Sequence, residues 1–373
     1  MQAKDFAFDR RVYLVMAATC MTVVAACSAA PASVSGRTSV DSGTSTVVDA
    51  GSTPPAPPVI DGGSGGSSCN CDVSQICVGG QCKDKGALAT PTFAACTNPP
   101  CINVYNNCAI PLWTQAVGSV TIDSGNVRAL APGASYQYAG LPSFGGGRLY
   151  AYYQEPSKMQ STTPVSFYNG YVEMAVNKDA NGAWAQNYDI SYVDSISLPV
   201  SVQAEGNCQA TRCGSQFVDW IAKLQECPTS LRYVANGVGS CMGSYNYCIT
   251  RDGTQTYDET KPYCRKMQTA HGYAGSLVYG GLFPAQPAQN VTFWDGVAGW
   301  NRGASGGSTN VADYYATEPY NDYARMIHVE MGCRATATVE GVYAFSTDDH
   351  QNQSGFVRCT SPVLDVIWCP YQG

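Results

Sequence analysis

The sequence has few charged residues and few histidines. Charged side chains make up 13% of its 373 residues, and the formal net charge is −7. Nucleic acid is therefore not an expected partner, because binding its phosphates needs clustered lysines and arginines. The three histidines, His271, His328 and His350, lack zinc-site spacing with any cysteine pair, so we predict no metal and no cofactor.

Motifs of two common enzyme classes are also missing. No serine lies in a G-x-S-x-G frame, which argues against a serine hydrolase of that type. The glycine run at Gly145, Gly146 and Gly147 precedes an expected strand rather than a helix, so it does not match a phosphate-binding loop. The chain is instead rich in glycine and tyrosine, with 38 and 24 residues, which indicates a β-rich secreted protein.

The longest apolar run lies near the start of the sequence. It is VYLVMAATCMTVVAA, follows Arg10 and Arg11, and is too short for a comfortable membrane span, so it is typical of a signal-peptide core. The run ends at VAAC, which resembles a bacterial lipobox. We predict a signal peptide over residues 1–26 and lipidation of Cys27, giving a lipoprotein of the bacterial cell envelope, at the outer membrane or cell surface. Ordinary cleavage and secretion is the alternative.

Composition divides the rest of the chain into three parts. Residues 27–68 are mostly Ser, Thr, Pro, Gly and Ala, which predicts a lipid-anchored flexible linker. Residues 69–86 carry four cysteines around a Gly-Gly turn, which predicts a small module with two bridges. Residues 96–372 form the main domain. Setting aside Cys20 in the signal and Cys27 for lipid leaves 16 of the 18 cysteines, an even number that favours a disulfide framework.

Short alternating runs separated by Gly, Asn and Pro turns follow Cys96, and they predict a mainly β sandwich or barrel. The runs are INVYNN, SVTIDSG, SYQYAGL, GRLYAYYQ, VSFYNGYVEMAV, NYDISYV and LDVIWC. One helix is expected within SQFVDWIAKLQE, with Ser215 as its N-cap. Its apolar stripe would consist of Phe217, Val218, Ile221 and Leu224.

Three carboxylates lie inside two of the expected strands. In the first strand Val172, Met174 and Val176 alternate with Glu173, so Glu173 should lie on the face away from the apolar set. In the second strand Asp189 lies opposite the apolar face. Asp194 follows an odd number of residues later, so it can join the other two only if the chain bends after Tyr192.

The order of these signals resembles that of the thaumatin-like proteins over roughly Ile102 to Tyr371. The segments that carry the resemblance are VYNNC followed by Trp113, GGRLY at 146–150, YDISYVD at 188–194 leading to LPV, YAFSTDD at 343–349, and VIWCP at 366–370. The resemblance implies a β-sandwich packed beside a disulfide-rich subdomain with one main helix, and an acidic cleft between them.

The resemblance also implies a set of disulfides. These are Cys108 with Cys369, Cys208 with Cys359, Cys213 with Cys333, Cys227 with Cys241, and Cys248 with Cys264, while Cys96 and Cys101 remain to close a local loop. Two further family bridges have no cysteines here. The segment 265–332 is longer than in typical plant members and contains many aromatic residues, so it could extend a sugar-binding groove or cover a sheet edge.

Carried over residue by residue, the family's acidic cleft positions are Glu173, Asp189, Asp194 and Asp348. Tyr152 replaces the family's cleft arginine, and Arg148 lies at a different position, usually basic and structural. The chain is also similar to the family 64 β-1,3-glucanases, in which a Glu and an Asp on adjacent strands act as acid and base. That similarity implies Glu173 as acid and Asp189 as base of an inverting endo-β-1,3-glucanase.

Two functions of different classes are therefore expected. The first is a monomeric, surface-anchored protein that binds β-1,3-glucan or a related polysaccharide and hydrolyses it if the carboxylate pair is competent. The replacement of arginine by Tyr152 favours binding over hydrolysis. The second is a non-catalytic, disulfide-stabilised domain that interacts with or inhibits another protein.

Overall fold

The structure is a computed structural model, and the residues it describes belong to one unit, Asp61–Gly373. The described residues are 69, 71–72, 74–118, 126–156, 170–227, 231–235, 238–243, 260–261, 322–333, 339–344 and 355–373. The expected signal peptide, Cys27, the linker, the Cys248 to Cys264 bridge and Asp348 lie outside them.

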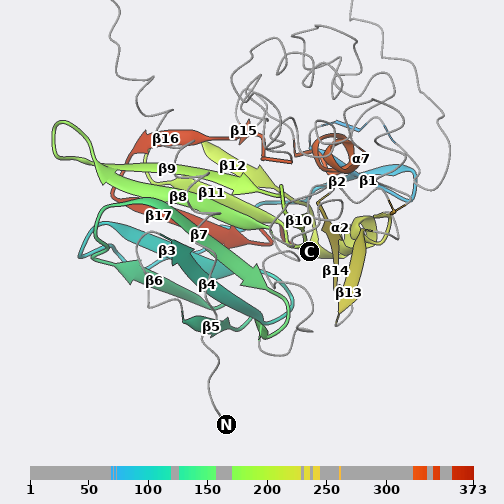
Figure 1. Cartoon of the computed structure of the whole chain (residues 1–373), viewed down its shortest axis with the longest axis horizontal. Coiled ribbons are helices and arrows are strands. Elements are labelled where there is room, and N and C mark those ends of the chain that lie inside the picture. Colours follow the sequence, from blue (N-terminus) through green and yellow to red (C-terminus); the bar gives the residue numbers. More distant parts are fainter. Residues whose placement is uncertain are drawn as a thin grey trace, which may run out of the picture. The chain divides into compact units, whose positions relative to one another are not determined.

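Two six-stranded sheets form a sandwich, as the alternating runs predict (Figure 1). The first sheet has the order β15-β12-β11-β17-β3-β6, and the second has the order β16-β9-β8-β7-β4-β5. The bounds of the first are β15 Val339–Glu340, β12 Ala210–Cys213, β11 Val200–Ala204, β17 Val363–Trp368, β3 Cys101–Asn106 and β6 Ser135–Ala139. The bounds of the second are β16 Val357–Thr360, β9 Trp184–Ser191, β8 Tyr171–Lys178, β7 Phe144–Tyr152, β4 Leu112–Gly118 and β5 Val127–Leu130.

The core lies between these sheets and follows the period-two pattern of the strands. Val172, Met174 and Val176 of β8 are at most 3% exposed, and Tyr188 and Ile190 of β9 are fully buried beside them. Strand β9 contacts β11 and β12 of the other sheet, so the two sheets share this core. We call the opposite face of the second sheet, which carries Glu173, its outer face.

A disulfide-rich subdomain adjoins the sandwich and carries the helix α2, Phe217–Leu224. It also holds a three-stranded sheet in the order β10-β14-β13, with β10 Ser195–Ile196, β14 Val238–Met242 and β13 Arg232–Ala235. A second helical segment consists of α7 Asp322–Arg325 and the π-helix η5 Met326–Glu330. The mainly β class with one main helix is therefore confirmed.

Two details of the predicted helix are wrong. The N-cap is Gln216 rather than Ser215, because the Ser215 hydroxyl donates to the Gln216 carbonyl instead of capping the first turn. The stripe is also rotated, since Val218 is 66% exposed whereas Trp220 is fully buried. The indole of Trp220 donates to the Ser197 carbonyl at 2.8 Å, which turns this face toward the sandwich.

The cysteine-rich module forms a hairpin of β1 Gln75–Val78 and β2 Gln81–Asp84 that packs against α2. Ile76 is fully buried in the shared core. Lys83 forms a 2.8 Å ion pair with Asp219 of the helix, and the Lys85 ammonium donates to the Gly332 carbonyl at 2.5 Å. The hairpin is thus fixed to the subdomain by apolar and charged contacts.

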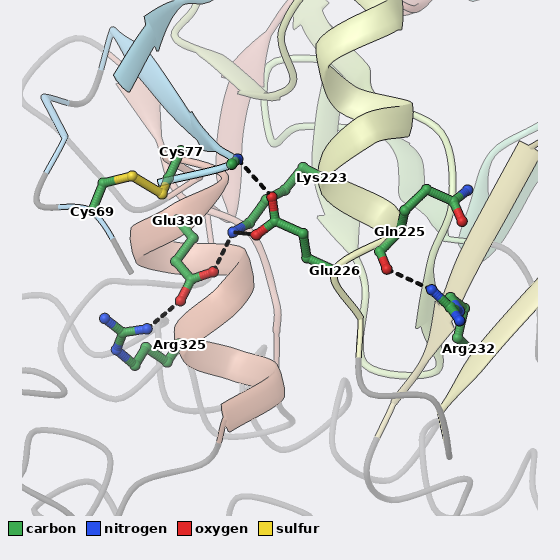
Figure 2. A network of polar contacts seen from close by, with 9 residues as sticks. Cys69, Cys77, Lys223, Gln225, Glu226, Arg232, Arg325 and Glu330 are labelled. Carbon is green, nitrogen blue, oxygen red and sulfur yellow. Dashed lines mark hydrogen bonds and ion pairs between the residues drawn. A yellow bond between two sulfur atoms is a disulfide. The ribbon is translucent and has the colours of Figure 1, made fainter. Parts of the chain in front are cut away.

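A buried cation links the hairpin, α2 and η5 (Figure 2). The Lys223 ammonium is fully buried and lies 2.8 Å from Glu226 and 2.5 Å from Glu330. Glu226 in turn accepts a bond of 2.9 Å from the backbone N–H of Gly79 in the hairpin turn, and Glu330 pairs with Arg325. Each carboxylate therefore has a second partner, as a buried charge requires.

Seven disulfides lie among the described residues. Two staple the hairpin, Cys69 with Cys77 and Cys71 with Cys82. The other five are Cys96–Cys101, Cys108–Cys369, Cys208–Cys359, Cys213–Cys333 and Cys227–Cys241. Four of these five are pairs that the resemblance implies, and Cys96–Cys101 is the expected local loop. Cys108–Cys369 joins the segments that follow the first and the last strand of the first sheet.

Candidate functional site

A row of charged side chains crosses the outer face of the second sheet. Arg148 of β7 is paired in register with Glu173 of β8, and Glu173 is paired in register with Asp189 of β9. Residues directly opposite in an antiparallel pair project on the same face with Cβ atoms about 5 Å apart. The row therefore places one cation and two carboxylates on three neighbouring strands.

Arg148 holds Glu173 directly. Its Nε donates to Glu173 Oε1 at 3.0 Å, and the guanidinium lies over the Tyr171 ring at 4.7 Å from the ring centre. The two charged side chains are 27% and 32% exposed, whereas Asp189 is only 5% exposed. A ligand approaching this face would thus meet the ion pair first and Asp189 beneath it.

Tyrosines form the floor beside this row. Tyr150 stacks on Tyr152 at 6.0 Å between ring centres and contacts Tyr171 at 5.0 Å. The three are buried as a cluster of their own, separate from the main core, with the partly exposed Trp113 packed against them. Alternation in β7 and β8 explains the cluster, because Tyr150, Tyr152 and Tyr171 lie on the same face as Arg148 and Glu173.

Asp194 belongs to the same region. The chain bends at Val193 and Asp194, which is the bend expected after Tyr192. The charge of Asp194 acts on Arg148, Tyr150 and Tyr171, so the carboxylate lies within electrostatic reach of the row. Its backbone carbonyl accepts a 2.7 Å bond from the N–H of Gly243, which holds the bend against the disulfide-rich subdomain.

The charges and burial shift the ionisation of the cationic and phenolic groups. Burial raises the pKa of Tyr150 to about 12, with Arg148 opposing and Asp194 adding to the rise. Burial alone would lower the pKa of Arg148, but Tyr171, Glu173, Tyr150 and Asp194 raise it well above its ordinary value. At neutral pH the site therefore presents neutral phenols and a permanent cation.

Tyr152, the expected arginine replacement, is buried and its hydroxyl donates to Gln115 Oε1 at 3.1 Å. It lies in the tyrosine cluster rather than beside Glu173. The cation of the site is instead Arg148, whose position the resemblance treats as structural. Trp113, Tyr150 and Tyr171 were not predicted as site residues, although period-two alternation from Arg148 and Glu173 places Tyr150 and Tyr171 on the same face.

No metal-binding chemistry emerges from the residues that the structure describes. The sulfur atoms of Cys69, Cys71 and Cys82 lie within 4.8 Å of one another, but all three cysteines are in disulfides and offer no thiolate. Among the described helices, none has the length and apolar character needed to cross a membrane.

The fold and bridges define a disulfide-rich β-sandwich protein with a charged row on one outer sheet face. Among solved structures, the chain is similar to the thaumatin-like xylanase inhibitor TLXI, with 14% identity and a TM-score of 0.23 over 38% of this chain and 91% of that one. It is likewise similar to the protein elicitor MoHrip2 from Magnaporthe oryzae, with 14% identity and a TM-score of 0.21 over 38% and 90%. No protein-family model and no curated protein matches the sequence.

Because both TM-scores are far below 0.5, the fold assignment rests on the chain itself. The strand order of the two sheets and the five bridges of the main domain define the fold.

Proposed function

We propose that this protein binds a neutral polysaccharide on the outer face of the second sheet, with β-1,3-glucan as the class that the resemblance implies. The observation that carries the proposal is the partly exposed ion pair of Arg148 and Glu173, with side chains 27% and 32% exposed, beside the partly exposed Trp113 on its cluster of tyrosines. A guanidinium offers only donors and a carboxylate only acceptors, so the pair can serve both roles of a sugar hydroxyl. Trp113, which is partly exposed and packs on the buried tyrosines, offers an aromatic surface that suits the apolar face of a sugar ring.

Binding without hydrolysis fits the geometry better than catalysis. An inverting mechanism needs a carboxylate base that reaches a water molecule on the substrate. Asp189, the expected base, is 5% exposed. Glu173, the expected acid, has one carboxylate oxygen engaged by Arg148. Hydrolysis would therefore require Asp189 to become more accessible than it is in the free protein, and Glu173 to act while Arg148 holds one of its oxygens.

The test measures binding and hydrolysis on the same purified protein. We expect the full chain to bind laminarin and release no reducing sugar, and Glu173→Gln to weaken binding about tenfold or more. Glu205→Gln is the matched control, because Glu205 is an exposed carboxylate outside the second sheet, and it should bind as the native protein does.

Two results would redirect the proposal. Release of reducing sugar that is abolished by both Glu173→Gln and Asp189→Asn would establish an endo-glucanase. Absence of laminarin binding by the native protein would overturn the polysaccharide proposal and leave the predicted protein-interaction or inhibitor role as the working hypothesis.

Seven disulfides among the described residues indicate a protein that matures in an oxidising compartment, as exported proteins do. We further propose that a lipid at Cys27 anchors it to the bacterial cell envelope and that residues 27–68 carry the sugar-binding domain away from the membrane. Cys27→Ser should move the protein from the membrane fraction to the soluble fraction. Unchanged fractionation would contradict the anchor.

A further inference from the structure

The outer face continues past the charged row into a second row of side chains. One row further along the strands, Ala175 of β8 is paired in register with Asn187 of β9, and Asn187 is paired with Arg358 of β16. Ala175 and Asn187 are partly exposed and Arg358 is exposed. On β7 the register shifts between Phe144 and Gly147, which marks a β-bulge opposite Ala175.

The two glycines of this bulge are not needed by the fold. A Cβ added at Gly145 or at Gly146 would meet no atom within 4 Å, and neither residue has the left-handed φ that favours glycine. Both are exposed. Glycine in a strand without such a requirement is typical of a place where a ligand approaches the backbone, and bulges often occur beside binding sites.

An exposed aromatic side chain lies at the β16 edge of this face, beside the second row. Phe356 is 47% exposed and directly precedes Val357, whose partner Tyr188 lies on the core face. Alternation therefore places Phe356 on the outer face, beyond Asp189 at the β16 end of the charged row and next to Arg358 of the second row. The residue before it, Gly355, has φ +69° and lies so close to the Gly341 carbonyl that no side chain fits there. This close approach holds the backbone in place directly before Phe356.

From these features we infer a second sugar subsite that runs from the Gly145–Gly146 bulge over Ala175 and Asn187 to Arg358 and Phe356. It rests on the proposed function and deepens it, because it makes the ligand a linear chain of several neutral sugar units lying across the strands. Three strand spacings separate β7 from β16, roughly 14 Å, which is the length of a short oligosaccharide rather than of one sugar. Phe356 stacks on a ring at the far end, and Asn187 and Arg358 contact its hydroxyls.

The experiment compares a long and a short ligand on the full chain. Phe356→Ala should weaken laminarin binding by roughly two- to tenfold, the factor that an aromatic contact of this kind contributes. Gly145→Leu should weaken it at least as much, because a Cβ at this position meets no atom within 4 Å and the new side chain would cover the bulge end of the second row. Both variants should bind the disaccharide laminaribiose within about a factor of two of the native protein.

Val127→Ala is the matched control, since Val127 is a 41% exposed apolar residue on β5, the opposite edge strand of the same sheet. It should bind both ligands normally. If Phe356→Ala and Gly145→Leu bind laminarin as the native protein does while Glu173→Gln does not, the second subsite is wrong and the proposed function stands. Equal losses for both ligands would also overturn the subsite. If the native protein binds no laminarin, the proposed function and the subsite fail together.

Discussion

Glu173 and Asp189 occupy directly opposed positions on the antiparallel strands β8 and β9. Like charges at such positions repel each other and destabilise the strand pair. On the other side of Glu173, the guanidinium of Arg148 forms a 3.0 Å ion pair with it and lies over Tyr171. Arg148 thus offsets the repulsion as well as offering donors to a ligand.

Arg148→Met should lower the free energy of unfolding by about 1–2 kcal/mol, because it removes the ion pair and the cation–π contact and leaves the two carboxylates opposed. Urea unfolding followed by tryptophan fluorescence measures this. Adding Glu173→Gln to Arg148→Met should recover part of the loss. Arg358→Met, at an exposed arginine of the same sheet, is the control and should change stability by less than about 0.5 kcal/mol. An equal loss in Arg358→Met would contradict the role given to Arg148.

The buried Lys223 and the exposed Lys83 of the subdomain should differ strongly in their contribution to stability. Lys223→Met should destabilise the protein by about 3–5 kcal/mol, because it removes a fully buried cation and leaves Glu226 and Glu330, only 20% and 12% exposed, without their shared partner. Lys83→Met is the matched control: Lys83 also contacts a carboxylate at 2.8 Å, but its side chain is 44% exposed, so the cost should be about 0–1 kcal/mol. Similar losses in both variants would show that burial does not set the value of these ion pairs.

The disulfide Cys108–Cys369 closes a loop with a sequence separation of 261, whereas Cys96–Cys101 closes one of only 5. On the loop-entropy model, replacing the first pair by alanines should cost about 5–6 kcal/mol and replacing the second about 2 kcal/mol. Thermal unfolding of the two double variants measures the difference. A loss for Cys96→Ala/Cys101→Ala as large as that for the long loop would argue against chain entropy as the cause.

Much of this architecture follows from sequence patterns of period two. The alternation around Glu173 correctly places Val172 and Met174 in the core and Glu173 on the outer face, because each strand has one covered face. The bend that brings Asp194 near Arg148 is also predictable, since without it the carboxylate falls on the wrong face.

Contacts between distant segments are what the sequence does not reveal. The predicted stripe of α2 included Val218 and left out Lys223, yet Lys223 is fully buried, because Glu330 of the distant η5 pairs with it together with the nearby Glu226. In the same way, nothing in the local sequence shows that the β7 residue beside Glu173 is Arg148 rather than Tyr152. That choice depends on the register of β7 against β8, which the bulge at Gly145 and Gly146 shifts.

A carboxylate on the outer face of the first sheet makes stability depend on pH. Asp365 of β17 accepts a 2.8 Å bond from Asn103 Nδ2, and Asn103 accepts one of 2.8 Å from Gln137. Burial raises the pKa of Asp365 to about 6 from its ordinary 3.8, and the nearby charge of Glu205 adds to the rise while the Asn103 bond opposes it. The native state therefore binds more protons than the unfolded chain between these two values.

The raised pKa of Asp365 makes the free energy of unfolding depend on pH. Where the native state binds more protons, stability falls as pH rises, so the contribution of Asp365 declines from about pH 4 to about pH 6 and stays low above that. Asp365→Asn keeps an oxygen for Asn103 and removes the charge, so at pH 8 it should be more stable than the native protein by roughly 1–2 kcal/mol, allowing for partial exposure. At pH 4 the gain should vanish. Urea unfolding at both pH values measures it, and a gain of equal size at pH 4 and pH 8 would show that the charge of Asp365 is not its source.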